Sequence, residues 1–461
     1  MTKAGVVTLQ NMIKASVIAM VLAATSAGAA HAQSITQALT AAYDHAPDLQ
    51  SALLSAKSSA ENIAQAQSRK LPTIGASIAG NQSWSLSGGN WSTGSSVTTG
   101  LSYNQTIFDN FKTEAQIEAA RAAAEVAEYQ IRNTEQNVLL SVVQAYMSVL
   151  TDRQLVALRE ENIQFFQAQL QSARDRLEVG EGTRIDVAQA EARLAQGQAS
   201  YRASVSSLEV SQATFQRFVG TRPQNLSTGH NYASLIPSRL ESAIAEAEVG
   251  HPAILMSKAA IRAAQAGSDA AEAAFGPTAT INGQVGSRWT GSSGPLSSDG
   301  LSGQLGFQVT VPLYAGGALG SSVRKANLEQ VKSEVDAMAA YDRVREAVIT
   351  AWAGIQSAEA QIQAAQAAVS AGSTVLEGVV QERDLGTRTT LDVLNSQAEL
   401  TSAREGLINA SSNKVIATFS LLSAMGRLTA GNLGLPVVVK SAVNYTQTVD
   451  DVWQELRTVA E

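Results

Sequence analysis

The strongest constraint on this chain is that it contains one pattern twice. The stretch VGEGTRIDVAQAEARL (179–194) aligns with LGTRTTLDVLNSQAEL (385–400) at a separation of 206 positions, so that Gly180 matches Gly386 and Asp186 matches Asp392. Nearer the N-terminus, Pro47 and Pro72 match Pro252 and Pro277 at a separation of 205. A fixed period of this length indicates two copies of one structural unit. We therefore expect a first repeat over 33–237 and a second over 238–461.

The first 32 residues are typical of a secretory signal peptide. Lys3 and Lys14 supply positive charge, an apolar stretch follows, and Ala30-His31-Ala32 has the small-residue pattern of a cleavage site. The alternative is an uncleaved membrane anchor, but the apolar stretch is short for a spanning helix. The chain contains no cysteine, so an exported form would be stabilised by packing, metal or assembly rather than by disulfides.

Each repeat contains a segment in which apolar and polar residues alternate, which predicts a β-hairpin over about 71–108 and another over about 277–313. In the second, Leu305, Phe307 and Val309 alternate with Gly306 and Gln308. Strands of about 10–15 residues are long enough for a tilted membrane span. Four aromatic residues are then candidates for a membrane girdle: Trp84, Trp91, Tyr103 and Trp289. The alternative is the edge of a soluble β-sandwich, which leaves the polar strand faces unexplained.

Long helices are predicted after each hairpin, over about 113–220 and about 319–426. Apolar residues recur every seven positions, as expected for coiled-coil packing, at Val142, Val149, Val156, Ile163, Leu170 and Leu177, and again at Val348, Ile355, Ile362, Val369 and Leu376. The second series is interrupted by Arg383, which aligns with Leu177. A helix of about 67 residues spans about 100 Å, so we expect the turns at 180 and 386 to lie far from the hairpins.

Four strands are too few to close a membrane barrel, because small membrane barrels begin at eight strands. An open sheet edge is not tolerated in lipid. We therefore expect the chain to complete its barrel by assembling with further copies of itself, and three copies would supply twelve strands.

Composition argues against several other classes of protein. The net charge is −7 and no basic run occurs, so nucleic acid is not an expected partner. His45, His230 and His251 have no metal-ligand spacing, and the GGALG stretch (316–320) lacks the Lys-Ser/Thr of a phosphate loop. We therefore expect no enzymatic activity, no metal and no cofactor, and we interpret GGALG as a strand-to-helix connection.

The tandem hairpin-plus-helix repeats, the PLYAGG that leaves the last strand (312–317) and GTRTTLDVLNSQAEL together resemble the TolC family of outer membrane channel proteins. The resemblance implies an α+β membrane protein that forms a homotrimer. Its twelve-stranded β-barrel would lie in outer membrane lipid and continue into a periplasmic α-helical coiled-coil tunnel, with the C-terminal segment (433–461) in an equatorial region around mid-tunnel. It also implies a periplasmic adaptor (membrane fusion) protein and an inner-membrane transporter, either ABC-type or proton-driven, as partners.

The implied function is an exit duct for type I protein secretion or multidrug efflux. A structural coiled-coil surface protein or adhesin is the alternative from another class, and the alternating strand faces disfavour it. The sequence does not separate secretion from efflux.

The repeated turns have two interpretations. In the first, Gly180 and Gly386 end helices in a left-handed conformation, and Asp186 and Asp392 cap the helices that follow. In the second, which rests on the resemblance, the turns form a gated periplasmic entrance. This assigns Asp392 to the entrance, Arg388, Asp186 and Arg383 to the links that close it, and Asn395 to a position where some relatives have a second Asp. The turns themselves would meet the adaptor, through Gly180, Glu181, Gly182, Thr183, Gly386 and Thr387.

Overall fold

The structure is a computed structural model that describes residues 33–227, 232–291 and 297–450, so the predicted signal peptide lies outside the described residues. The chain divides into two compact units. The first contains residues up to His45, Leu139–Leu235 and Gly354–Phe419, and the second contains Ala46–Val138, Ile236–Ala353 and residues from Ser420 onward. The two longest helices, α4 (Lys112–Glu178) and α8 (Ala318–Asp384), have 67 residues each and contribute to both units.

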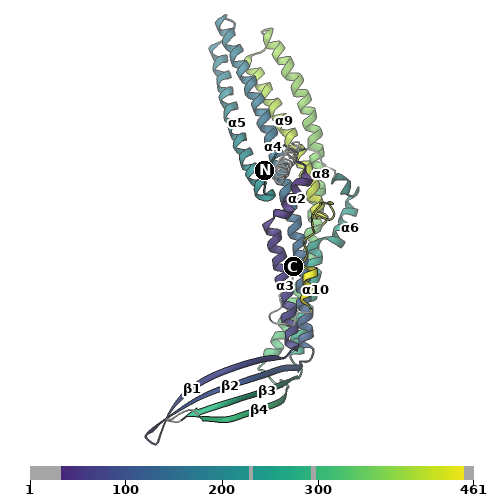
Figure 1. Cartoon of the computed structure of the whole chain (residues 1–461). Helices are drawn as coiled ribbons and strands as arrows, with labels where there is room; N and C mark the ends of the chain where they lie inside the picture. The colour runs from purple at the N-terminus through teal and green to yellow at the C-terminus, as the bar shows by residue number, and fades with distance from the viewer. Residues whose placement is uncertain (1–32, 228–231, 292–296, 451–461) are drawn as a thin grey trace, which may run out of the picture. The chain divides into compact units, whose positions relative to one another are not determined.

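The second unit contains one antiparallel sheet, in the order β1-β2-β3-β4 (Figure 1). Its strands are β1 (Thr73–Ser87), β2 (Asn90–Phe108), β3 (Thr278–Gly291) and β4 (Ser297–Thr310). The two predicted hairpins are confirmed, and β2 pairs with β3 to join them. The alternation that extends to Leu313 overstates β4, which ends at Thr310, because Pro312 has no N–H to donate to a sheet.

The two faces of the sheet differ in chemistry. The register places Ile78 of β1, Leu101 of β2, Val285 of β3 and Phe307 of β4 on the same face. The opposite face carries small and polar side chains, among them Ser77, Thr98, Asn282, Gln284 and Gln308. Many of the apolar side chains are exposed in the isolated protomer. The sheet therefore has one face suited to lipid and one suited to water.

Shorter helices accompany the sheet in the second unit: α3 (Pro47–Gln67), the 3-10 turn η1 (Ser68–Lys70), α6 (Leu240–Gly250) and α7 (Pro252–Ala273). The Ala-rich sequence of 238–275 predicts a single helix, and this prediction is wrong, because the structure interrupts the helix at His251. Pro252 occupies the first turn of α7, where its missing N–H costs nothing, and His251 Nδ1 accepts a hydrogen bond from the Ala253 N–H at 3.1 Å.

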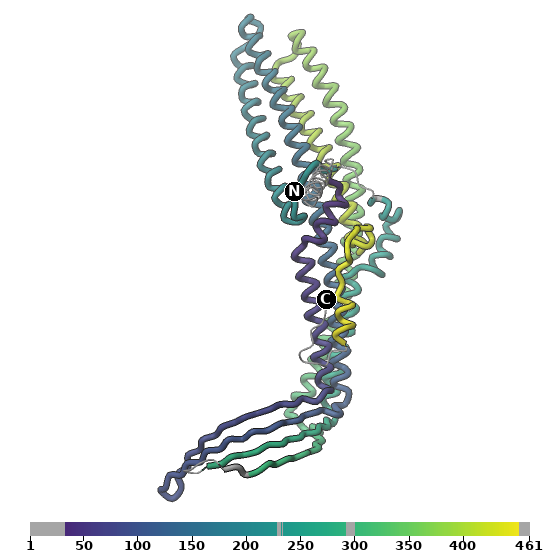
Figure 2. The backbone as a smooth tube through the Cα atoms, in the orientation of Figure 1, coloured from purple at the N-terminus to yellow at the C-terminus, as the bar shows by residue number. Residues whose placement is uncertain are grey.

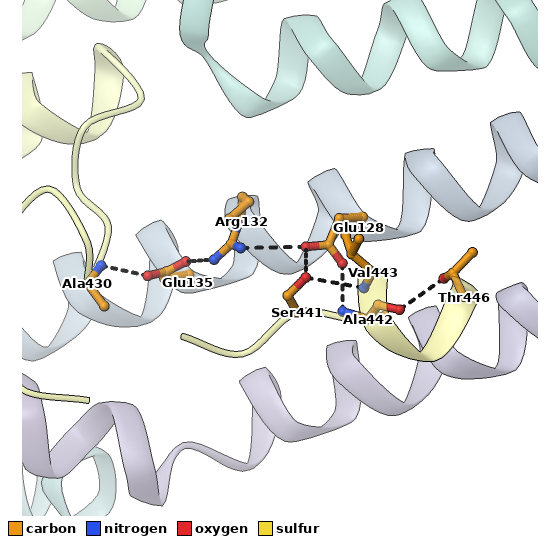
Figure 3. Close-up of polar contacts among 8 residues, drawn as sticks. All are labelled: Glu128, Arg132, Glu135, Ala430, Ser441, Ala442, Val443 and Thr446. Carbon is orange, nitrogen blue, oxygen red and sulfur yellow. Dashed lines mark hydrogen bonds and ion pairs between the residues drawn. The ribbon is translucent and has the colours of Figure 1, made fainter. Parts of the chain in front are cut away.

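The C-terminal segment packs along α4 through a row of carboxylates (Figure 3). Glu135 is fully buried, accepts a hydrogen bond from the Ala430 N–H at 2.6 Å and pairs with Arg132 at 3.2 Å. Two turns earlier, Glu128 accepts from Ser441 Oγ and from the Ala442 N–H, both at 2.8 Å, just before the short helix α10 (Val443–Val449). These charge-assisted bonds fasten a segment that has little regular structure of its own.

In the first unit, α5 (Arg184–Val219) and α9 (Thr390–Ala424) run beside α4 and α8, with α2 (Ile35–His45) and the 3-10 turn η2 (Tyr232–Leu235) nearby (Figure 2). The predicted heptad positions are buried or half-buried along both long helices, which confirms the coiled-coil seam. Glycines permit close approach: a Cβ atom at Gly197 of α5 would lie 3.1 Å from the Phe166 ring of α4. None of the described helices is both long enough and apolar enough to cross a membrane.

Candidate functional site

The repeated turns have the backbone conformation that the glycines predict. Gly180 and Gly386 both have φ of 82°, in the left-handed region that favours glycine. After Gly180, the Glu181 and Gly182 N–H groups donate to the Arg176 carbonyl oxygen at 2.8 and 2.9 Å. After Gly386, the Thr387 N–H donates to the Glu382 carbonyl oxygen at 2.9 Å. The prediction that these glycines end α4 and α8 is confirmed.

Both aspartates cap the helix that follows. The Thr183 N–H donates to the Asp186 carboxylate at 3.0 Å, and the Asp186 N–H donates to Thr183 Oγ1 at 3.2 Å. The same reciprocal pair joins Thr389 and Asp392, at 2.9 and 3.2 Å. This is a capping box, which satisfies two backbone N–H groups that the helix leaves free. Capping accounts for the presence of an Asp in both copies. In each carboxylate the capping bonds go to Oδ2.

The second turn carries an ion pair that the first one does not have. Arg388 Nε lies 2.9 Å from a Glu382 carboxylate oxygen, and both side chains are half exposed. Glu382 aligns with Arg176 and Arg388 with Gly182, so the pair is specific to the second repeat. Hydrogen bonds from the Thr389 backbone and hydroxyl lower the pKa of Asp392, with a smaller contribution from the charge of Arg388. Asp392 therefore keeps its negative charge to lower pH than an ordinary carboxylate does.

Arg383 connects the end of α8 to α4. Arg383 is charged and occupies the seam position aligned with Leu177, yet the residue is only 7% exposed. It donates to Asp384 from Nε at 3.0 Å and from Nη2 at 2.7 Å, and it donates to Gln169 Oε1 of α4 from Nη1. The buried guanidinium thus has an acceptor on each side, and α8 is hydrogen-bonded to α4 just before the turn.

A second row of polar contacts joins α9 to its neighbours. Asn395 Oδ1 accepts from Arg193 of α5 at 2.8 Å. Asn162 of α4 accepts from Gln397 at 3.0 Å and from Thr401 at 3.3 Å, and the last two side chains are buried. Sequence reasoning did not identify Gln169, Arg193, Asn162 or Glu382. The one available signal was a polar residue beside the heptad seam, because Gln169 precedes Leu170 and Asn162 precedes Ile163.

Within one protomer, each acidic or basic entrance candidate is bonded to a residue close to its own helix or turn. Asp186 is bonded to Thr183, Arg388 to Glu382, and Arg383 to Asp384 and Gln169. These are contacts within one protomer. The exposed surface of the turns includes Gly180, Glu181, Thr183, Gly386 and Thr387, while Gly182 is partly buried against the end of α4.

The four girdle candidates all lie on the apolar face of the sheet. Trp84 and Trp91 are near the β1–β2 turn, where Trp91 lies opposite Leu86. Trp289 lies opposite Val97, toward the far end of β3, and Tyr103 lies opposite Ile74 at the helix-proximal end. Two of these side chains, Trp84 and Trp91, are exposed in the protomer. No group of three or more His, Cys, Asp or Glu side chains within the described ranges is arranged to hold a metal ion.

Comparison with known proteins agrees with this geometry. The sequence matches the outer membrane efflux protein family over residues 38–221 and 243–427, one match in each repeat. It is 37% identical over 400 residues to the outer membrane efflux protein BepC of Brucella suis, covering 86% of both chains. It is 24% identical over 385 residues to the outer membrane protein TolC of Escherichia coli, covering 81% of this chain and 78% of TolC.

The solved structure of the Campylobacter jejuni CmeC outer membrane channel has the same fold, with a TM-score of 0.76 at 17% identity, over 90% of this chain and 89% of CmeC. Fold and sequence together define an export channel of the outer membrane. The chain belongs to the outer membrane efflux protein family, of the TolC type.

Proposed function

We propose that three copies of this chain close a twelve-stranded barrel in the outer membrane and act as a passive exit duct. The observation that carries the proposal is the four-stranded sheet, which has one apolar face, one polar face and two strand edges, β1 and β4, that no other described strand covers. Lipid cannot satisfy the N–H and C=O groups of those edges, so further copies must do so. The apolar face then meets lipid and the polar face lines a water-filled lumen.

A row of exposed apolar side chains on α8 supports self-assembly. Leu328, Val331, Val335 and Met338 recur at helical spacing and are all exposed in the protomer. The aligned positions on α4 are occupied differently: Ala122 is buried, Glu125 pairs with Arg262, and Arg132 pairs with Glu128. A second copy that covers the α8 row would bury apolar surface that is otherwise costly in water.

The proposed mechanism is gating of a solvated tunnel at the repeated turns. Asp392 would contribute a ring of carboxylates at the entrance, which attracts cations. Arg388, Arg383 and Asp186 would hold the closed state, with Asn395 weakening the ring relative to relatives that have an Asp there. The Arg383–Gln169 contact between α8 and α4 supports this assignment, because it joins one helical hairpin of the protomer to the other.

The exposed turns 180–183 and 386–387 are proposed as the docking surface for a periplasmic adaptor, which would connect the duct to an energised inner-membrane transporter. Trp84, Trp91, Tyr103 and Trp289 would anchor the barrel at the membrane interfaces. Residues 1–32 would direct export as a cleaved signal peptide.

Small-molecule efflux is the function we favour over protein secretion, because the name of the 37% identical relative BepC is that of an efflux protein. The test is a deletion strain, complemented with the wild-type gene, in which drug susceptibility and the secreted proteins are both measured. Greater susceptibility with an unchanged set of secreted proteins supports efflux. Loss of a secreted protein at unchanged susceptibility would assign the duct to secretion.

The class of protein is tested separately with purified material. A trimer in mild detergent that gives ion conductance in planar bilayers is expected. A monodisperse monomer without conductance would contradict the duct and leave the surface coiled-coil protein as the better interpretation.

A further inference from the structure

The two hairpins of the chain have the same register from their helix-proximal ends as far as Gln82–Ser95 in the first and Ser287–Leu301 in the second. Thr73 lies opposite Asn104 in the first hairpin, and their counterparts in the second repeat, Thr278 and Thr310, lie opposite each other. The same holds farther along, where the Ala79–Thr98 pair corresponds to Gln284–Gln304. The first strand is displaced by 205 positions and the second by 206, the separations found in the sequence. The internal repeat is therefore preserved in strand register.

The joint between the hairpins supplies a template for a joint that one protomer cannot make. Within the sheet, β2 pairs with β3, for example through Ser102 opposite Gln284 and Leu101 opposite Val285. The counterpart of β2 is β4 and the counterpart of β3 is β1, and these two strands form the open edges of the sheet.

We propose that β4 pairs with β1 of the partner subunit in the register of the β2–β3 joint. This inference rests on the proposed trimer and specifies how its subunits meet. It places Gln308 opposite Ala79 of the partner subunit, and Phe307 opposite Gly80 of the partner subunit. Gln308 and Ala79 belong to the polar face of the sheet, and Phe307 and Gly80 belong to the apolar face. A slip of one residue would turn one strand's apolar side chains into the lumen.

The residues after β4 provide an independent reason for this register. The β2–β3 joint is irregular between Thr106 and Phe108, and Phe108 then lies opposite Ala279. The counterpart of Thr106 is Pro312, and proline is tolerated where strand pairing is interrupted. The counterpart of Phe108 is Tyr314, which the register places opposite Ile74 of the partner subunit.

Exposure in the isolated protomer fits this contact. Tyr314 is 89% exposed and Ile74 is 74% exposed, whereas Phe108, which pairs with β3 of the same chain, is 42% exposed. The neighbouring Leu313 is 94% exposed. Pairing in the proposed register brings the two exposed side chains Tyr314 and Ile74 together across the subunit joint. The β4–β1 joint is thus a second copy of the β2–β3 joint, with its aromatic residue at the same end.

The absence of cysteine from the natural sequence makes the register directly testable. Two double variants probe successive pairs: Gln308→Cys with Ala79→Cys, and Phe307→Cys with Gly80→Cys. Directly opposite residues have Cα atoms about 4.5–5.5 Å apart, within the range of a disulfide, whereas diagonal neighbours are about 7–8 Å apart. Residues 79, 80, 307 and 308 are all exposed in the protomer, and a Cβ at Gly80 meets no atom within 4 Å.

Membranes from cells that express each variant are oxidised and run on non-reducing gels. For at least one of the two proposed pairs, Gln308→Cys with Ala79→Cys or Phe307→Cys with Gly80→Cys, we expect most of the chain to migrate as a covalent trimer. Single-cysteine variants should stay monomeric. Two controls are slipped by two residues on the same face: Gln308→Cys with Asn81→Cys, and Gln308→Cys with Ser77→Cys. A covalent trimer from a slipped control, and none from the proposed pairs, would overturn the register while leaving the trimer intact.

A fifth variant separates failure of the register from failure of the assembly. Ala79→Cys with Thr98→Cys joins β1 to β2 inside one chain, where the structure places these residues opposite each other. If this intrachain disulfide forms but no proposed or slipped pair links two chains, the β4 edge does not meet β1 of a partner subunit. That outcome would contradict both the register and the barrel closure of the proposed function.

Discussion

Gly276 lies against Asn110, so closely that a Cβ atom on Gly276 would overlap the Asn110 side chain. Asn110 follows β2 with φ of 58°, and its Nδ2 donates to the Ala273 carbonyl oxygen at the end of α7 at 3.2 Å. This contact joins the connection that leaves the first hairpin to the helix that enters the second. In the second repeat the corresponding connection is made by Gly316 and Gly317, with φ of 61° and 84°. The prediction that GGALG is a strand-to-helix connection is confirmed for its first two glycines, and the following Ala318 begins α8.

Replacement of Gly276 by alanine should destabilise the protein, because the added methyl group must displace Asn110 and break its bond to Ala273. Overpacking of this kind costs about 1–3 kcal/mol. The measurement is the thermal inactivation half-life of the detergent-solubilised protein. Gly267→Ala is the matched control, because Gly267 lies inside α7 with no atom within 4 Å of an added Cβ. Equal half-lives for the two variants would show that the Gly276–Asn110 contact contributes nothing.

Removal of the arginine links should open the entrance. In single-channel recordings we expect higher conductance from Arg388→Ser and from Arg383→Gln than from the wild type, with the trimer intact. An exposed pair contributes about 0–1 kcal/mol. Loss of about 1 kcal/mol in each of three copies would total about 3 kcal/mol, which changes an equilibrium by more than about a hundredfold. Wild-type conductance from both variants would show that these arginines stabilise only the local structure and do not hold the entrance closed.

Amide and alanine replacements of Asp186 should separate the effect of its charge from the effect of its cap. Asp186→Asn keeps an oxygen that can accept the Thr183 N–H, whereas Asp186→Ala removes the cap at a cost of about 1 kcal/mol. If Asp186 acts through its charge, both variants should raise conductance. If only Asp186→Ala changes conductance, the effect comes from the lost cap.

Asp392 should control cation preference, with a pH dependence set by its lowered pKa. Asp392→Asn, which can retain the cap, should weaken cation selectivity as much as Asp392→Ala does. In the wild type, a carboxylate with lowered pKa stays charged as pH falls through its ordinary value of 3.8. Reversal potentials under a salt gradient should therefore still show cation preference at pH 4. Loss of that preference well above pH 4 would contradict the assignment.

His251 should make stability fall in mild acid. Burial lowers the pKa of its imidazole, opposed in part by a hydrogen bond to the Ser423 backbone. Below the ordinary pKa of 6.5 the unfolded chain binds a proton that the folded chain does not, so the free energy of unfolding decreases as pH falls. His251→Asn keeps an N-cap acceptor and does not titrate in this range. Its thermal stability should decrease less between pH 7.5 and 5.5 than that of the wild type, and an equal decrease would exclude His251 as the cause.

Adaptor docking at the turns should be visible by cross-linking in cells. Glu181→Cys and Thr387→Cys, treated with a thiol-directed cross-linker, should give a covalent product with a periplasmic protein, because both positions are exposed on the turns. Gln164→Cys is the control, at an exposed position within α4. A product from the position 164 variant alone would place the docking surface on the helices instead.

Much of the fold follows from local patterns in the sequence. Two-residue alternation around Phe307 predicts a strand, seven-residue spacing from Val142 predicts a packed helix, and both appear in the structure. Gly180 and Gly386 mark their turns because few other residues adopt a positive φ at low cost. Capping by Asp186 and Asp392 is also predictable from the sequence, because each cap joins residues only three positions apart. The repeat itself determines that these features occur twice.

The partners of the entrance residues were decided only by tertiary structure. Arg383 meets Gln169, 214 positions away, and Arg193 meets Asn395, 202 positions away. The C-terminal segment is held by Glu128 and Glu135 of α4, far earlier in the chain. Periodicity shows which face of a helix is buried, but not which helix covers it or at what height. Those contacts depend on the positions of whole helices relative to one another, which the packing of their side chains determines.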